Sequence, residues 1–199
     1  MTTLTVHTQD ELDAALADPS IEYENTEVTI ESPVGVVITV DNRQGLNISV
    51  TGSSVVRVNN SSTIRAYGTS TVYSLDRSVV YSFGSSTVFA FDSSLVHTYD
   101  SSEVFALGTR TVHSTIWVTV HAYDKSKVYS AGSVTVFADG SSMVRAYGTS
   151  MVTAQDSSMV DAYNLSRVDV YDSAKAIAHD AGVTIVAHNT TQHTTPQHI

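Results

Sequence analysis

Apolar and polar positions alternate along most of the chain within a repeating unit of eight residues, an octad. From Thr51 to Val186 the sequence divides into seventeen octads without an insertion or a deletion. The sixth position is almost always Val, the eighth is usually Ala or Ser, the fourth is mostly Ser, and the fifth and seventh vary. Alternation with a period of two is typical of a strand with one buried face. We therefore expect positions four, six and eight to point inward and positions five and seven to point outward.

The second position of each octad predicts a tight corner. It is Gly, Asp or Asn in most octads, as in Gly68, Asp76 and Gly84. These residues tolerate a positive φ more readily than others do. Each octad is then one short strand and one corner, and all strands share the same in–out phase. This arrangement favours a parallel β-solenoid, whose coils bury their inner faces by stacking on one another.

The number of octads in one coil follows less directly from the sequence. Two octads would give a flat coil with two sheets, and three would give a triangular coil. At a spacing of three octads, four tyrosines align (Tyr99, Tyr123, Tyr147 and Tyr171), and His97 aligns with His121. At a spacing of two octads the agreement is weaker at the first position and similar at the second. We favour three octads per coil, with two as the alternative.

The first fifty residues predict a cap and irregular first coils. Residues 8–17 form an amphipathic pattern, with Thr8 as the N-cap and Glu11 completing a capping box. Strands are expected at Glu27–Glu31, Val36–Val40 and Leu46–Val50. We predict one all-β domain over residues 1–187, with the cap and first coils at 1–50, the octad repeats at 51–186, and a flexible polar tail at 188–199.

The order of these elements carries a resemblance. A strand, a helix with Glu11-Leu12 and Ala15-Leu16, and then stacked coils resemble the start of right-handed parallel β-helix proteins of the pectate-lyase-like class. The octad itself is similar to repeats in uncharacterised bacterial and phage proteins. The resemblance implies a single-stranded parallel β-helix over almost the whole chain. Its motifs are structural, so they carry little functional information.

Composition narrows the classes of partner. Only 15% of residues are charged and the formal net charge is −10, which disfavours nucleic acid and anionic membranes as partners. There is no Cys, so no disulfide or thiolate–metal framework forms. The sequence contains neither a signal-peptide pattern nor an apolar run long enough to span a bilayer. Cellular location is left open, with a virion as one setting.

Candidate chemical groups have simpler structural interpretations. A lyase would need an acidic calcium cluster, but Asp76, Asp100, Asp124 and Asp172 all fall at the corner position, where Asp is a turn former. An array without insertions also leaves little room for a pocket. Stacked His97 and His121 could bind a metal, but Tyr, Phe and Arg also occupy position seven. We expect no catalytic residue, metal or cofactor, and no enzymatic activity.

The outward positions in the middle of the chain suggest an interface instead. Position seven is aromatic there, and contiguous exposed apolar surface usually marks an interaction site. In a three-sided coil Tyr81, Phe105 and Tyr129 would share one face, and Phe89 and Phe137 another. The unit at 115–122 breaks the octad most strongly, because Ile116 replaces the corner Gly or Asp and Trp117, the only Trp, stands where Ser or Thr is usual. Either an interface or a local bulge that packs Trp117 against the neighbouring coil would account for this. The expected interface residues are Tyr81, Phe89, Phe105, Ile116, Trp117, Tyr129 and Phe137.

These observations favour a non-enzymatic structural or binding module. The setting we expect is a bacteriophage virion, as a capsid decoration, fibre or tail-associated protein. The expected partner is a second copy, in a homo-oligomer such as a trimer, or another virion protein. Two alternatives stay open: a β-helix that binds or degrades carbohydrate, with a glycan as partner, and an ice-binding solenoid.

Overall fold

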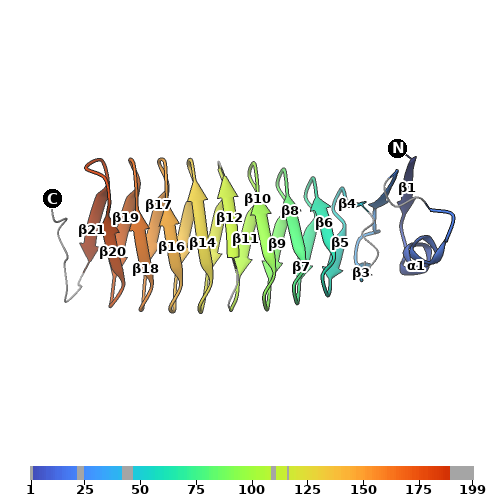
Figure 1. Cartoon of the computed structure of the whole chain (residues 1–199), viewed down its shortest axis with the longest axis horizontal. Helices are drawn as coiled ribbons and strands as arrows, with labels where there is room; N and C mark the ends of the chain where they lie inside the picture. Colours follow the sequence, from blue (N-terminus) through green and yellow to red (C-terminus); the bar gives the residue numbers. More distant parts are fainter. Residues whose placement is uncertain (1, 22–24, 42–46, 109–110, 116, 189–199) are drawn as a thin grey trace.

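The computed structural model describes residues 2–21, 25–41, 47–108, 111–115 and 117–188, and it is a parallel β-solenoid of about ten coils (Figure 1). Its strands form two sheets, of 11 and 10 strands, which together run the length of the rod. The first sheet contains β1 (Thr2–Val6), β2 (Thr26–Ile30), β4 (Asn47–Val50), β6 (Thr63–Ala66), β8 (Val79–Ser82), β10 (Leu95–Thr98), β12 (Thr111–Thr115), β14 (Lys127–Ala131), β16 (Met143–Ala146), β18 (Met159–Ala162) and β20 (Lys175–Ala178). The second contains β3 (Val37–Val40), β5 (Val55–Val58), β7 (Thr71–Ser74), β9 (Thr87–Ala90), β11 (Glu103–Ala106), β13 (Thr119–Ala122), β15 (Thr135–Ala138), β17 (Met151–Ala154), β19 (Arg167–Tyr171) and β21 (Thr184–His188).

One coil contains two octads and two strands, so the expectation of three octads per coil was wrong. Val96 pairs with Val80 on one side and with Val112 on the other, and the same spacing recurs through the repeats. The physical reason lies in the size of the inward residues. Val, Ala and Ser fill the thin space between two sheets that face each other directly, whereas a triangular coil has a wider centre that such side chains leave empty.

The predicted in–out phase of the octad is confirmed. Typical strands alternate between half-buried and buried residues, and the position-six residues form a continuous buried file from Val56 to Val168. Buried Ser hydroxyls at position four are often satisfied locally. Those of Ser78, Ser86 and Ser102, for example, donate to the carbonyl oxygen three residues earlier. At these corners the Ser side chain therefore braces the turn from the inside.

The corners have the backbone conformation that the sequence predicted. Asp76, Asp100, Asp124 and Asp172 all have a positive φ, between 54° and 59°. Backbone N–H groups also bond from one corner to the equivalent corner of the previous coil, as Ser85 N donates to the Gly68 carbonyl oxygen at 2.9 Å. The repeat is not free of insertions, however. Arg167 pairs with Thr184, so the last coil contains one extra residue and Ile185, not Thr184, takes the position of Val168.

The N-terminal cap forms as predicted. Helix α1 spans Gln9–Ala17, and the Thr8 hydroxyl accepts a hydrogen bond from Glu11 N at 3.3 Å. The Glu11 carboxylate accepts from His7 N rather than from Thr8 N, so the reciprocal half of the capping box is shifted by one residue. Leu12 and Ala15 are buried. The helix lies at the end of the rod, next to β1 in Figure 1, and its Leu12 belongs to the buried apolar cluster of the rod.

Candidate functional site

At position seven of the octad, two files of stacked side chains run along the outer faces of the rod, one on each sheet. On the first sheet Tyr81, His97, His113 and Tyr129 stack in sequence, and the Arg145 guanidinium lies 5.5 Å from the centre of the Tyr129 ring. The second file contains Tyr73, Phe89, Phe105, His121 and Phe137. Ring centroids within the files are 4.7–5.2 Å apart, close to the spacing of adjacent strands.

The grouping of the expected interface residues changes with the length of the coil. Tyr81 and Tyr129 lie on the first sheet, but Phe105 lies on the second with Phe89 and Phe137. The expected face of Tyr81, Phe105 and Tyr129 is therefore wrong. Ile116 lies outside the described residues. The predicted residues form two surfaces on opposite sheets and one corner.

Within each file, stacking covers both faces of most aromatic rings. A ring in the middle, such as Phe105, lies between Phe89 and His121 and presents mainly its edge. Phe137 differs because the next residue along its file is Thr153, so one ring face has no aromatic neighbour. Its side chain is 42% exposed. A hollow of about 220 Å³ lies beside it, lined in part by Thr153, Gln155 and Asp139.

Trp117 stands out at a corner of the rod. It is 72% exposed and has φ of 58°, in the left-handed region that a bulky residue seldom adopts. Every other described residue with a positive φ is Gly, Asn or Asp. Ser101 and Ser133 occupy the equivalent positions one coil before and after it. The rod therefore holds an indole in solvent among small polar neighbours.

The corner aspartates form part of the scaffold. The carboxylate of Asp76 accepts a hydrogen bond from Asn60 N at 2.9 Å, and that of Asp100 accepts from Gly84 N at 3.2 Å. Each carboxylate thus ties its corner to the previous coil. Asp76, Asp124 and Asp172 lie on one edge of the rod and Asp100 on the other, so the four do not gather. Within the described residues, no group of three or more His, Asp or Glu side chains could hold a metal ion.

The histidines pair differently from the sequence prediction. His97 stacks on His113, with ring centroids 5.2 Å apart, whereas His121 lies in the file of the second sheet between Phe105 and Phe137. The predicted stack of His97 on His121 is wrong, again because one coil contains two octads and not three. The His121 Nε2 lies 3.3 Å from the Glu103 carboxylate, on the strand next to its own.

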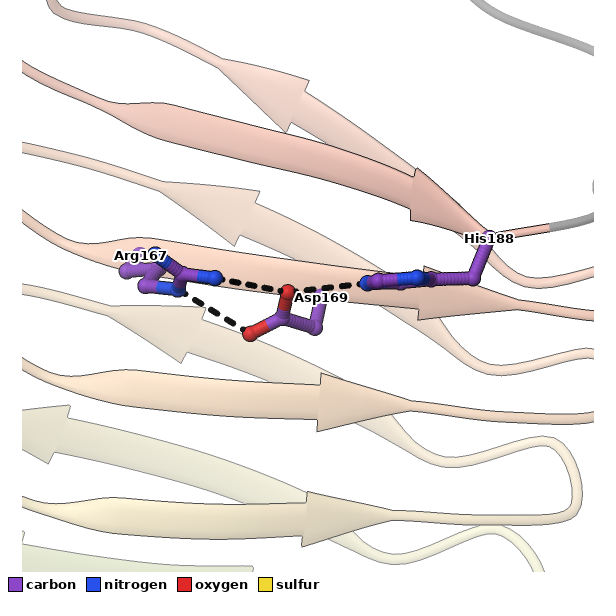
Figure 2. Close-up of polar contacts among 3 residues, drawn as sticks. All are labelled: Arg167, Asp169 and His188. Atoms are coloured by element: carbon purple, nitrogen blue, oxygen red, sulfur yellow. Dashed lines mark hydrogen bonds and ion pairs between the residues drawn. The ribbon is translucent and has the colours of Figure 1, made fainter.

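Two acidic side chains that the sequence analysis passed over organise the last coils. Figure 2 shows Asp169 between Arg167 and His188: both guanidinium contacts are 3.1 Å long, and His188 Nε2 lies 3.1 Å from Asp169 Oδ1. On the other sheet Asp161 lies 3.0 Å from His179 and 3.9 Å from Arg145. Each His also stacks on a Tyr of the previous coil. The signal in the sequence was Asp at position seven with a His about one coil later.

We expect the Asp169 contacts to give the last coil a stability that depends on pH. The Arg167 guanidinium, assisted by His188, holds the pKa of Asp169 below its ordinary value. A carboxyl whose pKa is lowered by folding stabilises the folded state above its unfolded pKa, about 3.9, and loses that effect as the pH falls through the folded value. Asp169→Asn should therefore lower the melting temperature at pH 7, and the difference from wild type should shrink below pH ~4. A difference that is unchanged at pH 2 would contradict this.

A third surface feature lies on the first sheet towards the C-terminal end. Exposed Met143 and Met159 line a hollow of about 270 Å³, with Lys127 and Lys175 at its two ends. It lies between the position-five and position-seven side chains of this sheet. Position five varies from octad to octad, so the sequence alone did not predict this hollow.

Comparison of the chain with protein-family models, with curated proteins and with solved structures gives no match. In the described part of the chain, α1 is too short and too polar to cross a membrane. The observations that bear on function are therefore the outward files, the exposed Trp117 and the scaffold that holds them.

Proposed function

We propose that the protein is a non-enzymatic structural and binding module, a rigid rod that docks on another protein surface through the Trp117 corner. We further propose that it serves as a component of a bacteriophage virion, as a capsid decoration, fibre or tail-associated protein. The single observation that carries the docking role is an indole that is 72% exposed and in a left-handed backbone conformation. The likeness of the octad to phage repeats motivates the virion setting.

The energetics of Trp117 favour an interface over a purely structural role. A left-handed conformation costs a non-Gly residue about 1–2 kcal/mol, and an Asp or Asn at this corner would avoid much of that cost. Trp is enriched among residues that contribute most to protein–protein binding, since its large surface is buried on contact. Strain at a single exposed residue is a reason to propose a function there.

The rest of the surface supports the same proposal. The files of stacked side chains join adjacent coils on both sheets and stiffen the rod. The carboxylates of Asp76 and Asp100 accept hydrogen bonds from backbone N–H groups of the previous coil. The hollows beside Phe137 and at Met143 are lined by side chains of the outward files. A stiff rod with a highly exposed Trp at one corner suits a spacer or an attachment element.

The fluorescence of Trp117 tests the docking role, because it is the only Trp in the chain. We expect emission typical of an exposed indole in dilute protein, and a shift to shorter wavelength that accompanies an increase in mass when the partner, a second copy or a virion protein, is added. Light scattering on a sizing column gives the mass. Trp117→Ser should abolish the association, while Phe137→Ser, on the second sheet, should leave it intact. Association that survives Trp117→Ser would contradict the proposal.

The virion setting has its own test. Virions purified from the source culture on a density gradient should contain peptides of this chain in a fixed ratio to the major capsid protein, as measured by mass spectrometry. Absence of the chain from washed virions would overturn the setting, and it would leave the docking role to be judged by the fluorescence experiment.

A second candidate function, glycan binding, rests on Phe137. Its free ring face, with Asp139 and Gln155 beside the hollow, is the combination of an apolar plane and polar groups that a sugar ring requires. A glycan array would show binding that Phe137→Ser removes and Trp117→Ser does not. The opposite dependence, or no binding, would exclude this candidate.

A further inference from the structure

The two-octad coil places two imidazoles directly beside each other on the outer face of the first sheet. His97 in β10 pairs in register with His113 in β12. Their ring centroids are 5.2 Å apart and the ring planes differ by 17°, the largest angle among the stacked ring pairs of the described chain. These two imidazoles are held less parallel than their neighbours.

These two histidines also differ from the others in their partners. His7, His121, His179 and His188 each contact a carboxylate or a carbonyl oxygen through a ring nitrogen. Within the part of the chain that the structure describes, no hydrogen bond or ion pair reaches the ring nitrogens of His97 or His113, whose contacts are with stacked rings. His113 is exposed and His97 is half-buried. Their nitrogens are thus available for a ligand from solvent.

The surroundings of His97 favour its neutral form, which is the form that binds a metal. Partial burial, together with repulsion from His113, lowers the pKa of His97. Neutral imidazole is the ligand form, because a proton and a metal ion compete for the same lone pair. The formal net charge of −10 also raises the local concentration of cations. The neighbours of the pair in the file are Tyr81 and Tyr129, which bring no cation next to it.

We propose that His97 and His113 together bind one divalent transition-metal ion such as Zn²⁺, with water completing its coordination. A Zn–N bond of about 2.0–2.1 Å in a tetrahedral site places two ligand nitrogens about 3.3 Å apart. To reach this separation, the two rings must tilt out of the stacked arrangement towards each other. Because only two ligands come from the protein, the bound metal ion can exchange with ions in solution. The bound ion clamps β10 to β12 in the middle of the rod, independently of the Trp117 corner.

Titration calorimetry with Zn²⁺ at pH 7.5 tests the site. All proteins carry His193→Gln and His198→Gln, so that the C-terminal histidines do not contribute, and wild type in this experiment means the chain with these two changes only. Wild-type chain should bind one Zn²⁺, and His97→Phe or His113→Phe should each weaken binding at least about tenfold. Phe preserves the stacked file, as in Phe89 and Phe105, while it removes the nitrogens. Either single substitution already removes the two-ligand site, because one imidazole alone cannot chelate the ion. The double variant should therefore bind Zn²⁺ about as weakly as each single variant.

The matched control is His121→Phe, a histidine with the same stacking on the other sheet. It should leave Zn²⁺ affinity unchanged. Zn²⁺ should also raise the melting temperature of the wild-type chain and of His121→Phe, but not of His97→Phe or His113→Phe. The proposal is overturned if Zn²⁺ does not bind, if either single Phe variant binds as tightly as wild type, or if His121→Phe weakens binding equally.

Discussion

Replacement of Val136 by Asp is expected to abolish the cooperative fold of the rod. Val136 lies in β15, is fully buried, and continues the inward file between Val120 and Val152. An unpaired carboxylate in such a narrow apolar interior is costly. Removing one partner of a buried ion pair, which likewise leaves an uncompensated buried charge, typically costs about 3–5 kcal/mol. That is comparable with the whole stability of many domains, about 5–15 kcal/mol. Each coil is stabilised by its neighbours, so the loss spreads along the stack.

Urea denaturation followed by circular dichroism measures this effect. Thr135→Asp is the matched control, since it introduces the same charge one residue earlier on the same strand but on the outward side. We expect the control to change the unfolding free energy by no more than about 0.5 kcal/mol. Equal effects of the two variants would mean that positions five and six are not on opposite faces.

Gly148→Ala is expected to be the second largest effect. A Cβ at this residue would lie 2.9 Å from both the nitrogen and the oxygen of Gly132, one coil earlier, and Gly148 has φ of +74°. The left-handed backbone costs a non-Gly residue about 1–2 kcal/mol, and forcing atoms into a packed contact adds about 1–3 kcal/mol. The corner would have to open, which would weaken the backbone bond from Thr149 N to the Gly132 carbonyl oxygen.

Gly52→Ala separates the two contributions. Gly52 has φ of +65°, but a Cβ there would meet nothing within 4 Å. In the same urea experiment, we expect the free energy of unfolding of this variant to fall by about 1–2 kcal/mol, the cost of the left-handed backbone alone. If Gly148→Ala costs no more than Gly52→Ala, the close approach between stacked corners is not a constraint on the sequence.

The local features of this fold could be predicted from the sequence because they depend on short-range rules. The phase of the strands follows from Val at position six, the corners follow from residues such as Gly68 and Asp76, and the cap helix follows from Thr8. Each of these was confirmed by burial, by positive φ or by a hydrogen bond. They needed no knowledge of which coil packs on which.

The length of the coil could not be settled in the same way. Coils of two and of three octads both contain a whole number of repeats, so either one keeps every inward residue inward. Only the variable outward side chains distinguish them, and the alignment of Tyr99 with Tyr123 was a coincidence between opposite corners. Phe89 and Phe105, two octads apart and stacked at 4.9 Å, were the more reliable signal.

The candidate site was predicted only in part, because the coil length was not settled by the sequence. Trp117 and Phe137 were among the expected interface residues, and both are exposed. The partners of each outward residue depend on the coil length, so the pairing of His97 with His113 appeared only in the structure. The role of Asp169 was missed because its partner His188 lies beyond the extra residue of the last coil.

Disulfide formation between engineered cysteines tests the two-sided coil most directly, because the natural chain has no Cys. Thr119 and Thr135 are paired in register on β13 and β15. Adjacent strands place their Cα atoms about 4.8 Å apart, within the range of a disulfide. Thr111 and Thr135 are three octads apart and lie on different sheets. Under mild oxidation of dilute protein, we predict an intramolecular disulfide in Thr119→Cys/Thr135→Cys and none in Thr111→Cys/Thr135→Cys, as read by mass spectrometry. A disulfide in the second pair and not in the first would contradict the two-octad coil and every pairing built on it.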